Sequence, residues 1–251
     1  MRILRFLPPP FLRSMTQQLI LELIPAPPPT LDNFIVGRNA AAVDAIKHCG
    51  NGRAVYLWGP DGAGRSHLLQ ARCGAITDAI YVHPSNAQSL LERILNDEIT
   101  FPKLVAVDDV NHLDDETQGQ LFALYNLWRA SAASPNAFAL IVSGSFSPQA
   151  MPIREDLRTR LGWDLVFRLE HLSDQDRTQA LNNQARERGL QLAPEVVNWL
   201  LTHYTRDMSR LITLINNLDH YSLEKQRGIT LPLLREFLAQ REPLLARQQH
   251  D

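Results

Sequence analysis

The sequence predicts an α/β protein with a parallel sheet flanked by helices, followed by a small all-α domain. Three observations lead to this prediction. A glycine-rich loop lies between an apolar run typical of a strand and the start of a helix, and its sequence is Gly59-Pro60-Asp61-Gly62-Ala63-Gly64-Arg65-Ser66. Short apolar runs then alternate with helical patterns up to residue 170, as in parallel sheets with crossover helices. From Ser173 to Gln240 only helical patterns occur.

The predicted elements follow one another without long gaps. The first strand is Ala54–Trp58, and a helix starts at Ser66 directly after the glycine loop. The remaining predictions for the first part are strands at 79–82, 104–108 and 137–143 and helices at 87–95 and 116–130. Such alternation places helices on both faces of the sheet.

The second part contains four predicted helices. Ser173 is a typical N-cap residue, and its helix ends by Gly189. Three more helical patterns cover residues 193–204, 208–224 and 231–240. We therefore expect an N-terminal tail at 1–24, a proline-rich spacer at 25–30, an α/β domain at 31–170 and a helical lid domain at 171–251.

The composition is that of a globular protein. With 251 residues and 45% hydrophobic side chains, the chain can bury a substantial core, and its net charge of −2 argues against broad nucleic-acid binding. Cys49 and Cys73 lie far apart, as expected of reduced thiols in the cytoplasm. The apolar start of the chain is interrupted by Pro8-Pro9-Pro10, so we predict neither a secretion signal nor a transmembrane span.

The glycine loop has the sequence context of a phosphate-binding P-loop. Successive backbone N–H groups and the positive end of the following helix converge on one anion in such a loop. We expect the phosphates of a nucleotide to contact residues Gly59, Gly62, Ala63, Gly64, Arg65, Ser66 and His67. P-loops normally carry Lys at the position of Arg65, and a guanidinium is a bulkier, planar group. The sequence therefore predicts nucleotide binding with weak hydrolysis.

A second element of the predicted site is the strand at 104–108, which ends in the acids Asp108 and Asp109. Such a carboxylate lies beside the P-loop in P-loop proteins, where it holds Mg²⁺ through water. We expect Asp108 and the hydroxyl of Ser66 to face Mg²⁺, with Asp109 as a further candidate. The plain alternative is a strand whose end simply reaches solvent.

The N-terminal tail carries an apolar hexapeptide, Gln18-Leu19-Ile20-Leu21-Glu22-Leu23. It is too short to form a core of its own. From composition alone, a strand packed on the body and a peptide that docks on a partner are about equally favoured. The spacer after it, Pro25-Ala26-Pro27-Pro28-Pro29, is stiff and extended.

Several segments together resemble the DnaA-like AAA+ family. They are Leu31–Gly37, Tyr56–Trp58, Gly62–Leu69, Asp156–Trp163 and Leu172–Asp174, and the resemblance extends from Gln18 to Leu238. It implies a P-loop AAA+ fold with a five-stranded parallel sheet and an all-α lid. It also implies that Phe34, Ile35 and Val36 wrap the adenine of ADP or ATP, with Mg²⁺ as a companion ion.

The resemblance further implies a regulator of replication initiation that acts on another protein. Arg160 corresponds to the family's arginine finger, which promotes hydrolysis of ATP bound to DnaA and so prevents re-initiation. Without the resemblance, Arg160 would be regarded as an ordinary surface arginine paired with nearby acids.

Gln18, Leu19, Leu21 and Leu23 resemble a motif that binds the DNA polymerase III sliding clamp, its β subunit, so contact with DNA would be indirect. Self-association into a homo-oligomer is also implied, because AAA+ modules share nucleotide sites between subunits.

Two positions depart from the family pattern. Ser145 occupies the sensor-1 region, where relatives often carry Asp. In the lid, the best alignment puts Ser209 where the sensor-2 arginine belongs and Arg210 one residue later. Because one residue rotates a helical side chain by about 100°, the contact of Arg210 with a nucleotide is the weakest of the expected ones.

Two other functions fit the same fold. A DnaA-like initiator or helicase loader would act directly on DNA, and salt-dependent DNA binding would identify it. DnaA carries a helix-turn-helix domain after the lid, whereas only a short segment follows the last predicted helix here. An adaptor with a purely structural nucleotide would leave DnaA hydrolysis unchanged.

Overall fold

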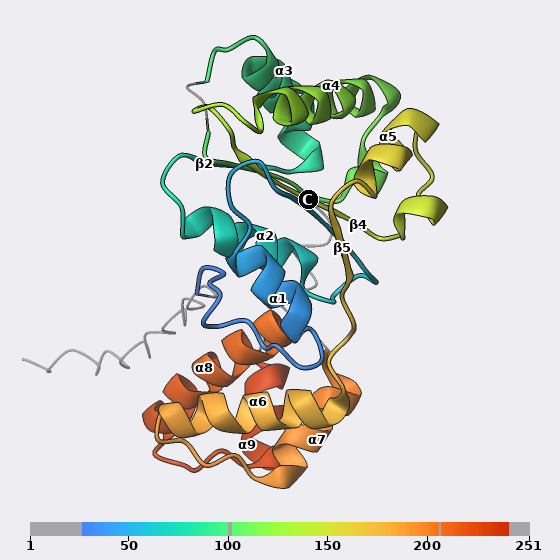
Figure 1. The fold of residues 1–251 in the computed structure, drawn as a ribbon. Helices are drawn as coiled ribbons and strands as arrows, with labels where there is room; N and C mark the ends of the chain where they lie inside the picture. The colour runs from blue at the N-terminus through green and yellow to red at the C-terminus, as the bar shows by residue number, and fades with distance from the viewer. Residues whose placement is uncertain (1–26, 100–101, 206, 241–251) are drawn as a thin grey trace, which may run out of the picture.

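The computed structural model describes residues 27–99, 102–205 and 207–240 (Figure 1). Its first part is built on a five-stranded sheet in the order β2-β3-β4-β1-β5, and every paired neighbour is parallel. The strands are β1 (Ala54–Trp58), β2 (Ala79–Val82), β3 (Leu104–Val107), β4 (Ala139–Gly144) and β5 (Leu165–Arg168). The predicted fold class, a five-stranded parallel sheet flanked by helices and followed by a helical lid, is confirmed.

Helices cover both faces of this sheet, as Figure 1 shows. The helices of the first part are α1 (Ala40–Lys47), α2 (Arg65–Gly74), α3 (Ala87–Leu95), α4 (Asp115–Ser131) and α5 (Glu155–Leu161). A short 3₁₀ turn precedes each of α3, α4 and α5. These turns are η1 (Pro84–Asn86), η2 (Val110–His112) and η3 (Pro148–Ala150). One apolar core packs α3, α4 and α5 against the sheet, and a second packs α1 and α2 against the other face.

Among the described residues, the lid is formed by four helices with a core of their own. They are α6 (Asp174–Glu187), α7 (Pro194–His203), α8 (Met208–Lys225) and α9 (Leu231–Ala239). Ser173 caps α6 as predicted, because its hydroxyl accepts from the Asp176 N–H while the Asp176 carboxylate accepts from the Ser173 N–H. In the part of the chain that the structure describes, no helix is long and apolar enough to cross a membrane.

The strand β5 and the helix α1 were not predicted from their own residues. Both are short, and Leu165 and Val166 of β5 are exposed at the edge of the sheet. β5 pairs only with β1 among the described strands, so its place in the sheet comes from a tertiary contact. The other strands were predicted within two residues at each end, because their side chains form short apolar runs.

The parallel arrangement brings three loops to one edge of the sheet. The carboxyl ends of β1, β3 and β4 lead to Gly59, Asp108 and Ser145. Next to this edge, the buried Asn39 side chain donates to the Glu170 carbonyl (3.0 Å) and accepts from the Glu170 N–H (2.8 Å). This pair of bonds fixes the segment before α1 to the segment between β5 and the lid.

Candidate functional site

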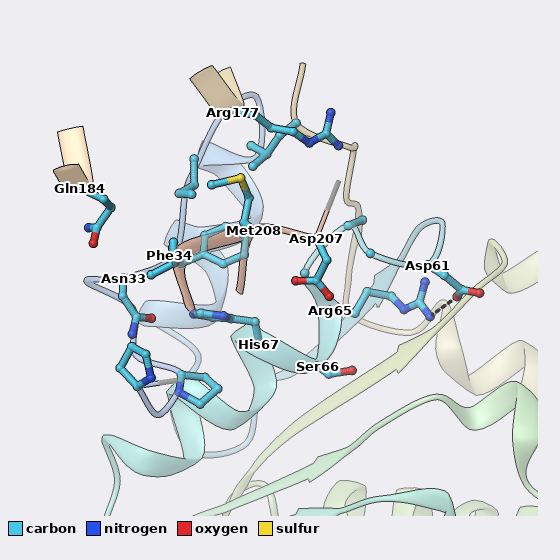
Figure 2. A pocket seen from close by; sticks show the side chains of 18 of the residues that line it. Asn33, Phe34, Asp61, Arg65, Ser66, His67, Arg177, Gln184, Asp207 and Met208 are labelled. Atoms are coloured by element: carbon cyan, nitrogen blue, oxygen red, sulfur yellow. Dashed lines mark hydrogen bonds and ion pairs between the residues drawn. The ribbon is translucent and has the colours of Figure 1, made fainter. Parts of the chain in front are cut away.

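A pocket of about 420 Å³ lies where the glycine loop, the segment before α1 and the lid meet (Figure 2). It is within the size range of small-molecule sites. We call it the P-loop pocket. Its lining residues are Pro27, Pro29, Asn33, Phe34, Ile35, Asp61, Gly62, Ala63, Gly64, Arg65, Ser66, His67, Asp109, Leu172, Arg177, Gln184, Asp207, Met208 and Ile212.

The glycine loop has the backbone geometry that its sequence predicts. Gly64 has φ of 97° and is the N-cap of α2, so the first N–H groups of α2 point toward the loop. A Cβ at this position would lie 2.6 Å from the Phe34 ring, and the positive φ disfavours any other residue. Gly59 lies deeper, since a Cβ there would lie 2.4 Å from the Leu169 carbonyl, and it is not among the lining residues.

The segment before α1 forms the opposite wall of the pocket. The rings of Phe34 and His67 are tilted toward each other with centroids 5.4 Å apart, and His67 Nε2 lies 3.0 Å from the Thr30 carbonyl. Burial lowers the pKa of His67, which leaves its ring neutral at pH 7. Phe34 and Ile35 line the pocket as expected, whereas Val36 does not and is 36% exposed.

Arg65 lines the pocket, but its guanidinium is bonded to the protein itself. The Nη1 atom donates to the Gly59 carbonyl, and Nη2 donates to Asp109 (2.7 Å), Asp61 (3.1 Å) and Ser145 (3.2 Å). Its side chain is only 6% exposed, while that of Asp61 is 91% exposed. Burial disfavours the charge, but hydrogen bonds to the two aspartates outweigh it, and the pKa of Arg65 is raised.

The carboxylate of Asp108 is fully buried in a hydrogen-bond network. The Tyr81 hydroxyl donates to its Oδ2 at 2.6 Å, and the Ser143 hydroxyl donates to its Oδ1. The Asp109 N–H also donates to Oδ1, at 3.1 Å. Gln70 in turn donates to the Tyr81 hydroxyl at 3.1 Å. Asp108 thus joins β3 to β2 and β4 beneath the loop.

These contacts test the expected Mg²⁺ site. Both oxygens of Asp108 accept hydrogen bonds inside the protein, and the Asp109 carboxylate is paired with a guanidinium. Ser66 lines the pocket with one neutral hydroxyl. Among the described residues there is no group of three or more side chains that could hold a metal ion. Because Asp108 is buried and Asp109 is paired with Arg65, the two carboxylates do not fit direct coordination of Mg²⁺, and their contact with the ion through water stays a prediction.

The two sensor positions differ in their relation to the pocket. Ser145 accepts from Arg65 and thus belongs to the cluster beneath the loop. Arg210 is not a lining residue, its side chain is 77% exposed, and its Nε atom lies 4.0 Å from an Asp207 carboxylate oxygen. Arg210 thus lies outside the pocket on the exposed side of α8, and its contact with a nucleotide stays a prediction.

The sequence did not single out the pocket residues that the lid contributes. Arg177 lies on α6 with a side chain that is 6% exposed and bonds Asp174 at 3.0 Å, and Gln184 lies two turns further along the same helix. Met208 and Ile212 come from α8. A spacing of seven residues between Arg177 and Gln184 was a signal, since it places both on one helix face.

Arg160 lies outside the P-loop pocket, on α5. Its guanidinium carbon lies 4.4 Å from the centre of the Phe122 ring and 4.0 Å from that of Trp163. Within residues 27–99, 102–205 and 207–240, no carboxylate forms an ion pair with it. By contrast, Arg154 at the start of α5 pairs with Asp156 at 2.8 Å.

The remaining predicted residues need only brief mention. Gln18, Leu19, Leu21 and Leu23 lie outside the described residues. Neither cysteine forms a disulfide, and burial raises the pKa of the Cys49 thiol to about 11 and that of Cys73 to about 12. Both thiols are therefore protonated and unreactive at pH 7.

Comparison with known proteins gives matches in sequence. The family of Hda lid domains matches residues 174–238, which include all of α6, α7 and α8. An uncharacterized protein of Haemophilus influenzae is 31% identical over 234 residues, which cover 89% of this chain and 99% of that protein.

Solved structures give matches in fold. Domain III of the replication initiation protein DnaA from Thermotoga maritima superposes with a TM-score of 0.64 at 20% identity, over 84% of this chain and 95% of that one. DnaA from Aquifex aeolicus in its AMPPCP-bound form gives a TM-score of 0.59 at 24% identity, over 78% of this chain and 68% of that one.

Proposed function

Because this chain belongs to the Hda/DnaA-like AAA+ family and is a DnaA-related replication regulator, we propose that it promotes hydrolysis of ATP bound to DnaA. In this proposal the P-loop pocket holds an adenine nucleotide, with ADP as the working ligand. The N-terminal motif binds the sliding clamp on DNA. Arg160 is presented to the nucleotide site of a DnaA molecule, and the result is that re-initiation is prevented.

The nucleotide part of the proposal is supported by the lining of the P-loop pocket. The N-terminus of α2 and the loop glycines offer N–H groups to phosphates, while Phe34 and Ile35 offer an apolar wall to a base. The related DnaA from Aquifex aeolicus binds the ATP analogue AMPPCP. Titration of the purified full chain with ADP and ATP in a calorimeter tests this part.

The observation that carries the proposal is the environment of Arg160. Contacts with two aromatic rings hold its guanidinium in a defined direction without cancelling its charge. Arg160 is half-buried, where such contacts contribute about 0.5–2 kcal/mol each, and a stronger anionic partner can displace them. A guanidinium that keeps its charge in this way can contact the γ-phosphate of a nucleotide bound to a neighbouring protein. Negative charge grows on that phosphate in the transition state of hydrolysis.

The decisive experiment compares Arg160→Ala with Arg158→Ala, a matched control on the same helix. Stimulated hydrolysis is measured with DnaA, clamp and DNA in single turnover. Removing an arginine finger lowers such rates by about 10³-fold or more, so Arg160→Ala is expected to abolish stimulation. Arg158→Ala is expected to keep it. Full stimulation by Arg160→Ala would contradict the assigned role of Arg160.

The clamp part of the proposal rests on the motif at residues 18–23. A double substitution, Leu21→Ala with Leu23→Ala, removes the two side chains that would fill an apolar groove. Each truncation of a buried anchor costs about 1–3 kcal/mol, so clamp affinity is expected to fall at least tenfold. ADP binding by the same variant serves as the control and is expected to stay unchanged.

A further inference from the structure

The cluster beneath the glycine loop is organised around a fixed positive charge. Arg65 connects the loop to the end of β3, because one of its nitrogen atoms contacts both Asp61 and Asp109. Its other terminal nitrogen bonds the Gly59 carbonyl at the start of the loop. A lysine has a single ammonium group on a flexible stem and could not bridge these positions in the same way.

In this arrangement, the carboxylates of Asp108 and Asp109 are hydrogen-bonded within the protein and are not free to contact a divalent cation directly. Asp109 is 25% exposed and bonds the guanidinium at 2.7 Å. Asp108 is 0% exposed, and both of its oxygens accept from Tyr81, Ser143 or the backbone. A cation at this edge would therefore meet a buried guanidinium of like charge. Other oxygens in the lining include the neutral hydroxyl of Ser66 and the carboxylates of Asp61, which is bonded to that guanidinium, and Asp207 of the lid.

Positive groups face the pocket without a metal ion, although the carboxylates of Asp61, Asp109 and Asp207 also line it. The guanidinium of Arg65 lies at the base of the loop, the N-terminus of α2 points into the pocket, and Arg177 of the lid lines it. We propose that the P-loop pocket binds a nucleoside diphosphate without a divalent cation, and that Arg65 is the residue that makes binding metal-independent. This proposal rests on the proposed function, because it assumes that the pocket holds a nucleotide.

The test measures the affinity of the full chain for ADP by calorimetry, once with Mg²⁺ and once with EDTA. The two dissociation constants are expected to agree within about twofold, because the metal adds no protein contact. An affinity that falls about tenfold or more in EDTA would overturn the proposal and leave nucleotide binding itself intact. If ADP does not bind under either condition, the nucleotide part of the proposed function fails and this inference fails with it.

The variant Arg65→Lys tests whether Arg65 is the cause. It keeps the charge but releases Asp109 and Asp61 from their shared partner, so ADP is expected to bind about tenfold more tightly with Mg²⁺ than with EDTA. Arg168→Lys is the matched control, since Arg168 stacks on Trp58 at 5.4 Å outside the pocket. Circular dichroism and thermal melting establish that both variants fold. Metal-independent binding by Arg65→Lys would overturn the assignment to Arg65.

Discussion

Replacement of Asn39 by Ala is expected to loosen the connection between the segment before α1 and the segment that leads to the lid. Asn39 is 4% exposed, and its amide makes two hydrogen bonds to the backbone of Glu170, at 3.0 and 2.8 Å. The Asn39 amide thus occupies both backbone hydrogen-bonding groups of Glu170, as a neighbouring β-strand would. The segment that it fixes carries Phe34 and Ile35 of the P-loop pocket.

The size of the effect follows from these two bonds. Each hydrogen bond contributes about 1 kcal/mol net, and truncation leaves a donor and an acceptor of Glu170 without their partner. We therefore expect Asn39→Ala to lower the free energy of unfolding by about 2 kcal/mol. For a chain of this length, that loss lowers the melting temperature by about 4–8 °C.

Urea unfolding of the full chain, followed by tryptophan fluorescence, measures this loss. The midpoint is expected to fall while the slope with urea stays the same, because the folded structure is retained. Asn96→Ala is the control, since Asn96 is exposed and no side-chain hydrogen bond of Asn96 occurs among the described residues. A loss below about 0.5 kcal/mol in Asn39→Ala, equal to that of an ordinary surface substitution, would refute the reasoning.

Three further predictions concern the P-loop pocket. Gly64→Ala is expected to weaken ADP binding at least tenfold in calorimetry, because φ of 97° and the Phe34 ring at 2.6 Å exclude a Cβ. Arg210→Ala is expected to change ADP affinity less than about twofold, since its side chain is 77% exposed outside the pocket. Because burial lowers the pKa of His67, the unfolded chain takes up this proton at higher pH than the folded protein does. The free energy of unfolding is therefore expected to fall as pH drops below about 6.5, and His67→Gln should show a smaller fall in urea titrations at pH 7.5 and 5.5.

The sequence was sufficient to predict most of the sheet and the lid. β1, β2 and β3 are short apolar runs between turn residues, and such runs have few alternatives once a P-loop follows the first of them. Among the lid helices, α6 has a clear N-cap in Ser173, and α7 begins with Pro194, which favours the first position of a helix. β5 has neither signal, because its four residues become a strand only through pairing with β1.

The contents of the candidate site could be predicted only in part. The loop glycines act through local backbone geometry, so a motif is enough to find them, whereas Phe34 was expected only from the family resemblance. The partners of Arg65 are different, since Asp109 and Ser145 are 44 and 80 residues away in the sequence. Which of several acids a guanidinium contacts depends on the packing of β3 and β4 beside β1, and a motif carries no information on that.

Two of the arginines that the sequence singled out, Arg65 and Arg160, lie in opposite environments, and under the proposed function this difference bears on where hydrolysis occurs. Arg65 is buried and bonded to two carboxylates, so moving it toward a phosphate would leave Asp61 and Asp109 without their partner. Arg160 contacts only the faces of two rings among its described neighbours, and it can turn to an outside anion at small cost. Under the proposed function, this distribution of charge lets the protein keep its own nucleotide and supply a guanidinium to the nucleotide of another protein. Exchange of the two environments, with a free cation at the P-loop and a paired one on α5, would instead suit an enzyme that hydrolyses its own ligand.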